Sequence, residues 1–325
     1  MTDVMFLWYT TLNRKKIKGK MNMKDELIQK IERVKKEKNA VILAHYYVSG
    51  EIQAIADFVG DSFYLAKVAK QVEAQTIVFC GVSFMGESAK VLNPEKTVLM
   101  PDRTADCPMA HMVRDGLIEE MRKKYEDLAV VCYVNSVIDL KCKSDVCVTS
   151  SNAVKIVKAL PNKNIFFIPD ENLGRYVAEQ VPEKNIILNK GFCPKHKDVT
   201  AEQVEREKEK YPQALVLSHP ECSKAVLDLS DFIGSTAEII DYAKKSAAKE
   251  FIVCTECGVA YQLEKNDPEK RFYFVEPCPI CSDMKKNTLE KILHVMQKGE
   301  NAVELEEETR KKALLPLDKM LELAK

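Results

Sequence analysis

Three cysteines recur at nearly constant spacing, and each lies in a polar, proline-containing turn after an apolar stretch. This cysteine trio consists of Cys107, Cys193 and Cys281, which are 86 and 88 residues apart. Thiolates from three separate turns suit a [4Fe–4S] cluster, whose irons prefer cysteine ligands. Three ligands for four irons leave one iron free to bind a substrate oxygen and to act as a Lewis acid. Three buried structural cysteines are the alternative, but they would not need such regular spacing.

A second pattern of cysteines favours a different metal. Cys254, Cys257, Cys278 and Cys281 form two C-x2-C pairs separated by 20 residues, the spacing of a zinc ribbon. This pattern would make the last part of the chain a structural zinc site, and would leave the first two members of the trio without a role. The alternative function is therefore a zinc-stabilised repeat protein that binds partners or acts as a scaffold.

Hydroxyl side chains are expected at three helix starts, again in phase with the repeat. Ser62, Ser150 and the pair Ser235–Thr236 each precede a helical pattern. Backbone N–H groups and the helix dipole favour anions at such positions. Ordinary N-capping explains each residue alone. Three of them on one rim predict anion pockets for substrates that carry several carboxylates or a phosphate.

A further polar set follows the first strand of each unit. Its members are His45, Tyr47, Tyr133, Asn135, His219 and Glu221. A single histidine at such a point is usually structural. His219 and Glu221 are more informative, because a histidine and a carboxylate two residues apart can share a face and serve as acid–base groups.

The elements that must position these residues repeat three times in the order strand–helix–strand–helix–strand. The first strands are predicted over 41–44, 129–134 and 214–217, and a trio cysteine follows the last strand of each unit. Right-handed crossovers would make each unit a small parallel sheet covered by helices. Polar residues after the carboxyl ends of such strands form ligand sites. We predict an α/β fold of three pseudo-threefold-related repeats of about 87 residues, each a three-layer α/β/α unit, around a central active-site cavity.

These boundaries divide the 325 residues into five parts. The parts are an N-terminal extension over 1–22, repeats over 23–110, 111–196 and 197–284, and C-terminal helices over 285–325 that pack on the repeats. A hydrophobic fraction of 46% is sufficient for buried cores in a chain of this length.

Composition excludes several function classes. Lys and Arg total 49, as do Asp and Glu, so no net charge favours nucleic acid or an anionic membrane as a partner. No run approaches the roughly 18 apolar residues that a membrane span needs. Eleven cysteines without a secretory signal predict a reducing cytoplasm, where cysteines more often serve metal binding or catalysis than disulfides.

Several short motifs together resemble the quinolinate synthase family, iron–sulfur enzymes of NAD biosynthesis, and the resemblance runs from about residue 24 to 323. The motifs are Leu43–Tyr47 (LAHYY), Val59–Ser62 (VGDS), Gly81–Glu87 (GVSFMGE), Pro101–Arg103 (PDR), Cys107–Ala110 (CPMA), Tyr133–Ser136 (YVNS), Thr149–Ala153 (TSSNA), Cys193–Pro194 (CP), His219–Cys222 (HPEC), Gly234–Thr236 (GST) and Met284–Thr288 (MKKNT).

The resemblance implies condensation of iminoaspartate with dihydroxyacetone phosphate to quinolinate, with release of phosphate and water. It implies a [4Fe–4S] cluster held by the cysteine trio, with one iron that has no cysteine ligand. Tyr47, His219 and Glu221 become candidates for proton transfer. The implied substrate-binding residues are His45, Tyr47, Ser62, Phe84, Tyr133, Asn135, Ser150, His219, Glu221, Ser235 and Thr236. The upstream aspartate-oxidising enzyme is a candidate partner.

Overall fold

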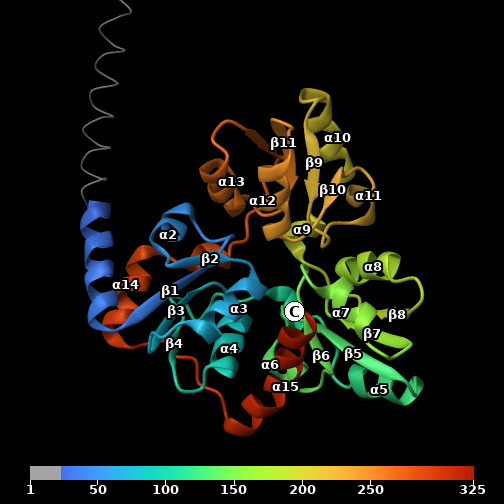
Figure 1. Ribbon diagram of the computed structural model, residues 1–325, viewed down its shortest axis with the longest axis horizontal. Helices are drawn as coiled ribbons and strands as arrows, with labels where there is room; N and C mark the ends of the chain where they lie inside the picture. The colour runs from blue at the N-terminus through green and yellow to red at the C-terminus, as the bar shows by residue number, and fades with distance from the viewer. Residues whose placement is uncertain (1–22) are drawn as a thin grey trace, which may run out of the picture.

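The computed structural model describes residues 23–325, so the predicted extension over 1–22 lies outside the described residues. Figure 1 shows three small sheets, each accompanied by helices, and a first helix over 23–37 at the edge of the molecule. Ile31 and Val34 of this helix are buried, as its apolar stripe predicts. Over residues 23–325, no helix has the length and apolar character that crossing a membrane requires.

The three sheets are parallel, four-stranded and identical in strand order. Their orders are β2-β1-β3-β4, β6-β5-β7-β8 and β10-β9-β11-β12. The strands are β1 (Ala40–His45), β2 (Phe58–Gly60), β3 (Thr76–Cys80), β4 (Thr97–Leu99), β5 (Leu128–Tyr133), β6 (Val146–Val148), β7 (Asn164–Ile168), β8 (Asn185–Leu188), β9 (Leu215–Ser218), β10 (Phe232–Ile233), β11 (Glu250–Cys254) and β12 (Arg271–Phe274). The shared order confirms the predicted α/β fold of three repeats.

Helices follow most strands and cover the sheets (Figure 1). They are α2 (Gly50–Ile55), α3 (Ser62–Gln71), α4 (Ser83–Leu92), α5 (Leu117–Lys124), α6 (Ile138–Cys142), α7 (Ala153–Ala159), α8 (Glu171–Gln180), α9 (Pro194–Lys197), α10 (Ala201–Lys210), α11 (Lys224–Leu227), α12 (Thr236–Lys245), α13 (Ala260–Asn266), α14 (Leu289–Lys298) and α15 (Glu307–Leu323). The last helix, α15, contacts α4 of the first repeat and α6 and β6 of the second.

Each sheet contains one more strand than the sequence pattern predicted. The extra strands β2, β6 and β10 have only two or three residues, too few for an alternating pattern to show. For the same reason the sequence indicates one helix over 53–59, whereas α2 ends at Ile55 and β2 follows it. The sequence pattern also indicates a helix over 112–125, whereas α5 begins only at Leu117, after Gly116 in the left-handed conformation with φ of 74°.

The buried hydrophobic residues form three clusters. One continuous cluster runs through the first two repeats and the C-terminal helices α14 and α15. The third repeat has two clusters of its own. Val216 and Leu217 are adjacent in β9 and belong to different clusters, so these clusters lie on opposite faces of the sheet. The third repeat is therefore a separately packed unit.

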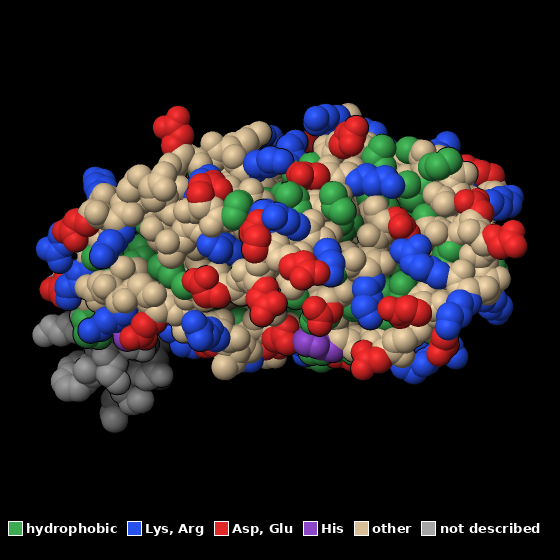
Figure 2. All heavy atoms as spheres, turned by 90° about the horizontal axis from the view of Figure 1, so that it is seen from below, with side chains coloured by type: hydrophobic (Ala, Val, Ile, Leu, Met, Phe, Trp, Pro, Cys, Tyr) green, Lys and Arg blue, Asp and Glu red, His purple; other side chains and the backbone are tan. Residues whose placement is uncertain are grey.

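Charges of both signs are interspersed on the face that Figure 2 shows, and neither sign forms a continuous field there. This agrees with the zero net charge of the sequence. Hydrophobic side chains on this face are scattered between the charges, which is usual for a protein surface.

Candidate active site

A cavity of about 270 Å³ collects residues from all three repeats. His45 and Tyr133 end β1 and β5, and His219 follows β9, so the equivalent strands of the three sheets deliver side chains to one place. The predicted residues that line the cavity are His45, Tyr47, Ser62, Phe84, Cys107, Tyr133, Asn135, Ser150, Cys193, His219, Glu221, Thr236 and Cys281.

Ser235 is the one predicted site residue that does not line the cavity. It is the N-cap of α12, and its Oγ accepts a hydrogen bond from the backbone N–H of Glu238. The Glu238 carboxylate in turn accepts from the backbone N–H of Ser235. This capping box uses the polar groups of Ser235 within its own helix, and Thr236 faces the cavity instead.

The helix starts differ at the three hydroxyl positions. Ser62 is the first residue of α3 and Thr236 is the first residue of α12, as predicted. Ser150 lies three residues before α7, which begins at Ala153, so it lines the cavity from a turn rather than from a helix start. The Asp61 carboxylate already accepts the N–H of Tyr64 in the first turn of α3.

The cysteine trio lies in the loops after β4, β8 and β12, and each member is partly buried. Burial and the nearby Glu221 carboxylate raise the pKa of Cys107 to about 12 and the pKa of Cys193 well above its ordinary value. Burial also raises the pKa of Cys281. Buried thiols of raised pKa are expected to ionise when a metal is bound beside them.

The donor chemistry of this trio fits an iron–sulfur cluster. A negative charge on Cys281 raises the pKa of Cys107, and a negative charge on Cys107 raises the pKa of Cys193. Among the described residues, the only group of His, Cys, Asp and Glu whose ligand atoms lie within 4.8 Å of one another is Cys193, His196 and Glu221. The trio is thus spread around the cavity, as several irons require, rather than gathered around one ion.

The zinc-ribbon interpretation is wrong. Cys257 and Cys278 form a disulfide, and Cys254 is fully buried at the end of β11. With Cys257 and Cys278 paired and Cys254 buried in the sheet, four thiolates cannot surround one zinc ion. The disulfide also departs from the expectation that these cysteines serve metal binding or catalysis. Cys281 is free and lines the cavity, which leaves it available to the trio.

A chain of hydrogen bonds crosses the cavity wall and joins residues of different repeats. His196 Nδ1 lies 2.6 Å from Glu221 Oε2, and His196 Nε2 lies 2.8 Å from Thr255 Oγ1. Thr255 Oγ1 is also 2.8 Å from the Tyr47 hydroxyl, which lies 2.7 Å from Thr236 Oγ1. All of these side chains are well buried or line the cavity.

With a neutral His196, the donor and the acceptor of these hydrogen bonds can be assigned. An ionised Glu221 can only accept, so His196 Nδ1 carries the proton and His196 Nε2 becomes an acceptor. The Thr255 hydroxyl then donates to His196, and its oxygen accepts from Tyr47. The chain therefore orients the Tyr47 proton as well as the His196 ring.

The charge states of the cavity follow from burial and from these contacts. Burial opposes ionisation of Glu221, but His196, His219 and a hydrogen bond from Tyr133 hold its pKa below its ordinary value. Burial lowers the pKa of His45 and of His219 to about 3. At neutral pH Glu221 is therefore ionised, and His45 and His219 are neutral.

Tyr47 and Tyr133 retain their protons at neutral pH. Burial and the nearby Glu221 carboxylate raise the pKa of both phenols well above the ordinary value. Asn135 Oδ1 is buried and has no hydrogen-bond partner among the described residues. Because a buried acceptor without a partner is costly, Asn135 is available for a donor group of a bound substrate.

Sequence reasoning missed His196, Thr255 and Glu256. His196 and Glu256 line the cavity, and Thr255 connects His196 to Tyr47. A signal was present for His196, because it lies three residues after Cys193, on the short helix α9 that Cys193 caps. Thr255 and Glu256 directly follow β11, at the carboxyl edge where polar residues gather.

Comparison with known proteins matches this arrangement to one family. Residues 29–322 match the family described as Quinolinate synthetase A protein. The quinolinate synthase of Fusobacterium nucleatum subsp. nucleatum is 55% identical over 295 residues, which are 91% of this chain and 98% of that protein. The quinolinate synthase of Clostridioides difficile is 48% identical over 302 residues, which are 93% of this chain and 99% of that protein. The quinolinate synthase of Aquifex aeolicus is 53% identical over 245 residues, which are 75% of this chain and 76% of that protein. The chain belongs to the quinolinate synthetase A family.

Proposed function

We propose that this protein is a quinolinate synthase that condenses iminoaspartate with dihydroxyacetone phosphate to quinolinate and releases one phosphate and two waters. The observation that carries the proposal is the single cavity to which each of three repeats contributes a thiol and polar side chains. The family supports the same activity, because the relatives of known name are quinolinate synthases over nearly the whole chain.

The cofactor in this proposal is a [4Fe–4S] cluster held by Cys107, Cys193 and Cys281. When bound, it supplies Lewis acidity through the iron that has no cysteine ligand. The side chains around it bind, orient and exchange protons with the substrates.

Substrate binding is assigned to hydroxyl and amide groups from different repeats. The two substrates together carry two carboxylates and one phosphate, so the cavity needs several hydrogen-bond donors. Ser62, Ser150 and Thr236 supply one hydroxyl from each repeat. The free oxygen of Asn135 can accept from an amine or hydroxyl of the substrates.

Proton transfer is assigned to Glu221 and Tyr47, with His219 beside them. Glu221 is ionised, and it can take a proton from carbon or nitrogen during condensation. The Tyr47 phenol remains protonated and can supply a proton to a departing oxygen. His219 Nδ1 accepts the backbone N–H of Glu221 at 3.3 Å, which fixes the backbone that carries this carboxylate.

Iminoaspartate has to be supplied by an enzyme that oxidises aspartate, and this enzyme is the partner that we propose. A cytoplasmic location, which the cysteine content predicts, stays a prediction.

Anaerobic purification and an assay of quinolinate formation test the proposal. We expect a brown protein with about four irons per chain, which forms quinolinate from the two substrates. A colourless protein that remains inactive after treatment with iron and sulfide would overturn the proposal.

A further inference from the structure

The backbone N–H group of every cysteine in the trio donates a hydrogen bond to an acidic side chain. The three bonds are Cys107 N to Asp106 Oδ1 (2.8 Å), Cys193 N to Asp170 Oδ2 (3.1 Å) and Cys281 N to Glu256 Oε1 (3.0 Å). We refer to Asp106, Asp170 and Glu256 as the carboxylate clamps. None of them is needed for the mechanism above.

Two of the clamps occupy equivalent positions in their repeats. Asp170 lies two residues after the end of β7, and Glu256 lies two residues after the end of β11. The equivalent position after β3 is Val82, which has no acceptor. In that repeat Asp106, the neighbour of Cys107, provides the carboxylate instead. The contact is thus present in all three repeats, although in the first repeat the carboxylate comes from a different position in the sequence.

Asp170 and Glu256 are buried and have both carboxylate oxygens occupied by backbone groups. Asp170 is 0% exposed, and its Oδ1 accepts the N–H of Leu173 as the N-cap of α8. Glu256 is 1% exposed, and its Oε2 accepts the N–H of Gly258. Lys285 Nζ lies 2.8 Å from Glu256 Oε1 and balances its charge.

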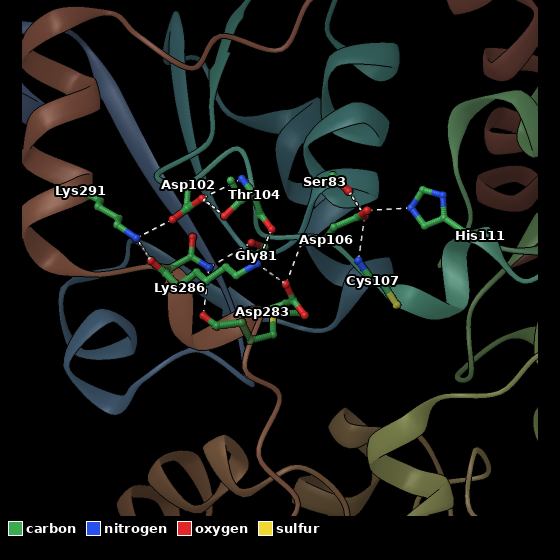
Figure 3. A network of polar contacts seen from close by, with 12 residues as sticks. Gly81, Ser83, Asp102, Thr104, Asp106, Cys107, His111, Asp283, Lys286 and Lys291 are labelled. Carbon is green, nitrogen blue, oxygen red and sulfur yellow. Dashed lines mark hydrogen bonds and ion pairs between the residues drawn. The ribbon is translucent and has the colours of Figure 1, made fainter.

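The first clamp belongs to a wider polar network, which Figure 3 shows. Asp106 Oδ1 accepts the Ser83 hydroxyl as well as Cys107 N, and Asp106 Oδ2 lies 2.7 Å from His111 Nε2. The backbone N–H of Asp106 donates to Asp283 Oδ1 at 3.3 Å. Asp283 lies two residues after Cys281, so this network joins the loop of the first ligand to the loop of the third.

We propose that Asp106, Asp170 and Glu256 are positioning residues for the cluster, because they fix the backbone of the three ligand cysteines before metal binds. This inference rests on the proposed function, which supplies the cluster. A hydrogen-bonded N–H restricts the backbone of the cysteine and therefore the direction of its Cα–Cβ bond into the cavity. Partners of this kind commonly affect metal affinity by about 10–100-fold.

The geometry predicts different outcomes for isosteric amides at the three clamps. In Asp170→Asn and Glu256→Gln, one of the two oxygens that accept backbone N–H groups becomes an NH2 group, which faces a donor. In Asp106→Asn, the amide oxygen can keep both bonds of Oδ1, and the NH2 group can donate to the ring nitrogen of His111. The first two variants should weaken the site and the third should preserve it.

The experiment measures iron release from the reconstituted holoenzyme to an excess of chelator under anaerobic conditions. Thr200→Ala is the matched control, because it removes the N-cap of α10 and leaves every trio cysteine untouched. We expect Asp170→Asn and Glu256→Gln to release iron about 10–100-fold faster than the wild type. Asp106→Asn and Thr200→Ala should release it at a rate close to that of the wild type.

A second measurement does not depend on variants. In the wild-type protein without metal, amide hydrogen exchange at the three cysteines should be slow, as for hydrogen-bonded amides. Exchange as fast as in an open loop would overturn the proposal that the carboxylate clamps fix the backbone of the cysteines, even if the variants failed to fold.

The outcomes distinguish a failure of this inference from a failure of the proposed function. Wild-type rates of iron release in Asp170→Asn and Glu256→Gln would overturn the clamps and leave the quinolinate synthase activity standing. Equally fast release in Thr200→Ala would also overturn them, because a general loss of stability would explain the effect. A wild-type protein that takes up no cluster would overturn the proposed function and the clamps together.

Discussion

Replacing Thr255 with valine removes one hydroxyl from the chain that joins Tyr47 to His196. Valine has nearly the same shape as threonine, so the change leaves no cavity at this fully buried position. It removes the bonds of 2.8 Å to the Tyr47 hydroxyl and to His196 Nε2. Tyr47 keeps its bond to Thr236, whereas His196 Nε2 loses its partner among the described residues.

The expected loss of stability follows from the unpaired Nε2 atom of His196. A buried polar group without a partner costs about 1–3 kcal/mol, and this amount should appear as a loss of stability in the metal-free protein. If the same contact also orients Tyr47 and His196 in the transition state, kcat falls by about 5–150-fold, since 1.4 kcal/mol corresponds to about tenfold.

Steady-state kinetics with both substrates provide the assay, with Thr255→Ser as the matched control. Serine keeps the hydroxyl and removes only the methyl group, so its kcat should stay near that of the wild type although its stability falls by about 1 kcal/mol. We expect KM to change little in both variants, because Thr255 does not line the cavity. Wild-type kcat in Thr255→Val, or an equal loss in Thr255→Ser, would refute the reasoning.

Three further predictions concern the cluster, the base and the buried histidines. Cys281→Ser should lose the cluster whereas Cys278→Ser should keep it, as measured by iron content, because Cys281 faces the cavity and Cys278 pairs with another cysteine. Glu221→Gln should keep its iron and lower kcat by about 100-fold or more, the usual contribution of a general base. The pKa values of His45 and His219 lie near 3 in the folded protein and near about 6.5 in the unfolded chain, so stability should fall as pH drops below about 6.5. Each histidine then contributes a loss on the order of 2 kcal/mol at about pH 5, measurable by urea unfolding of the metal-free protein.

Each of these predictions can fail in a defined way. An intact cluster in Cys281→Ser would show that a different residue is the third ligand. Full activity in Glu221→Gln would remove this carboxylate from proton transfer. Equal stability of the metal-free protein at pH 7 and pH 5 would mean that the histidines titrate in the folded state, contrary to their burial.

Repetition explains why much of the cavity could be predicted from the sequence. Cys107, Cys193 and Cys281 keep phase across three units, and a phase shared by three copies indicates a common position in space. His45 and His219 follow from the same argument, because the carboxyl ends of equivalent strands meet at one cavity.

The same logic explains what could not be predicted. His196 has no counterpart in the other repeats, where Ala110 and Met284 lie three residues after the trio cysteine. The pairing of Cys257 with Cys278 depends on how two loops approach each other, which spacing alone does not reveal. For Ser235, a predicted substrate-binding residue, the sequence could not distinguish substrate binding from helix capping, and in the structure the capping box with Glu238 uses its polar groups.

The separate packing of the third repeat has a consequence for how the protein responds to its substrates. Since the two clusters of this repeat are distinct from the large cluster of the other two repeats, denaturant should unfold the metal-free chain in two steps rather than one. Cys281, Glu221 and Thr236 face the cavity from the third repeat, while the other trio cysteines face it from the first two. Anything held between them binds only the assembled form, so occupation of the cavity should merge the two steps into one cooperative transition.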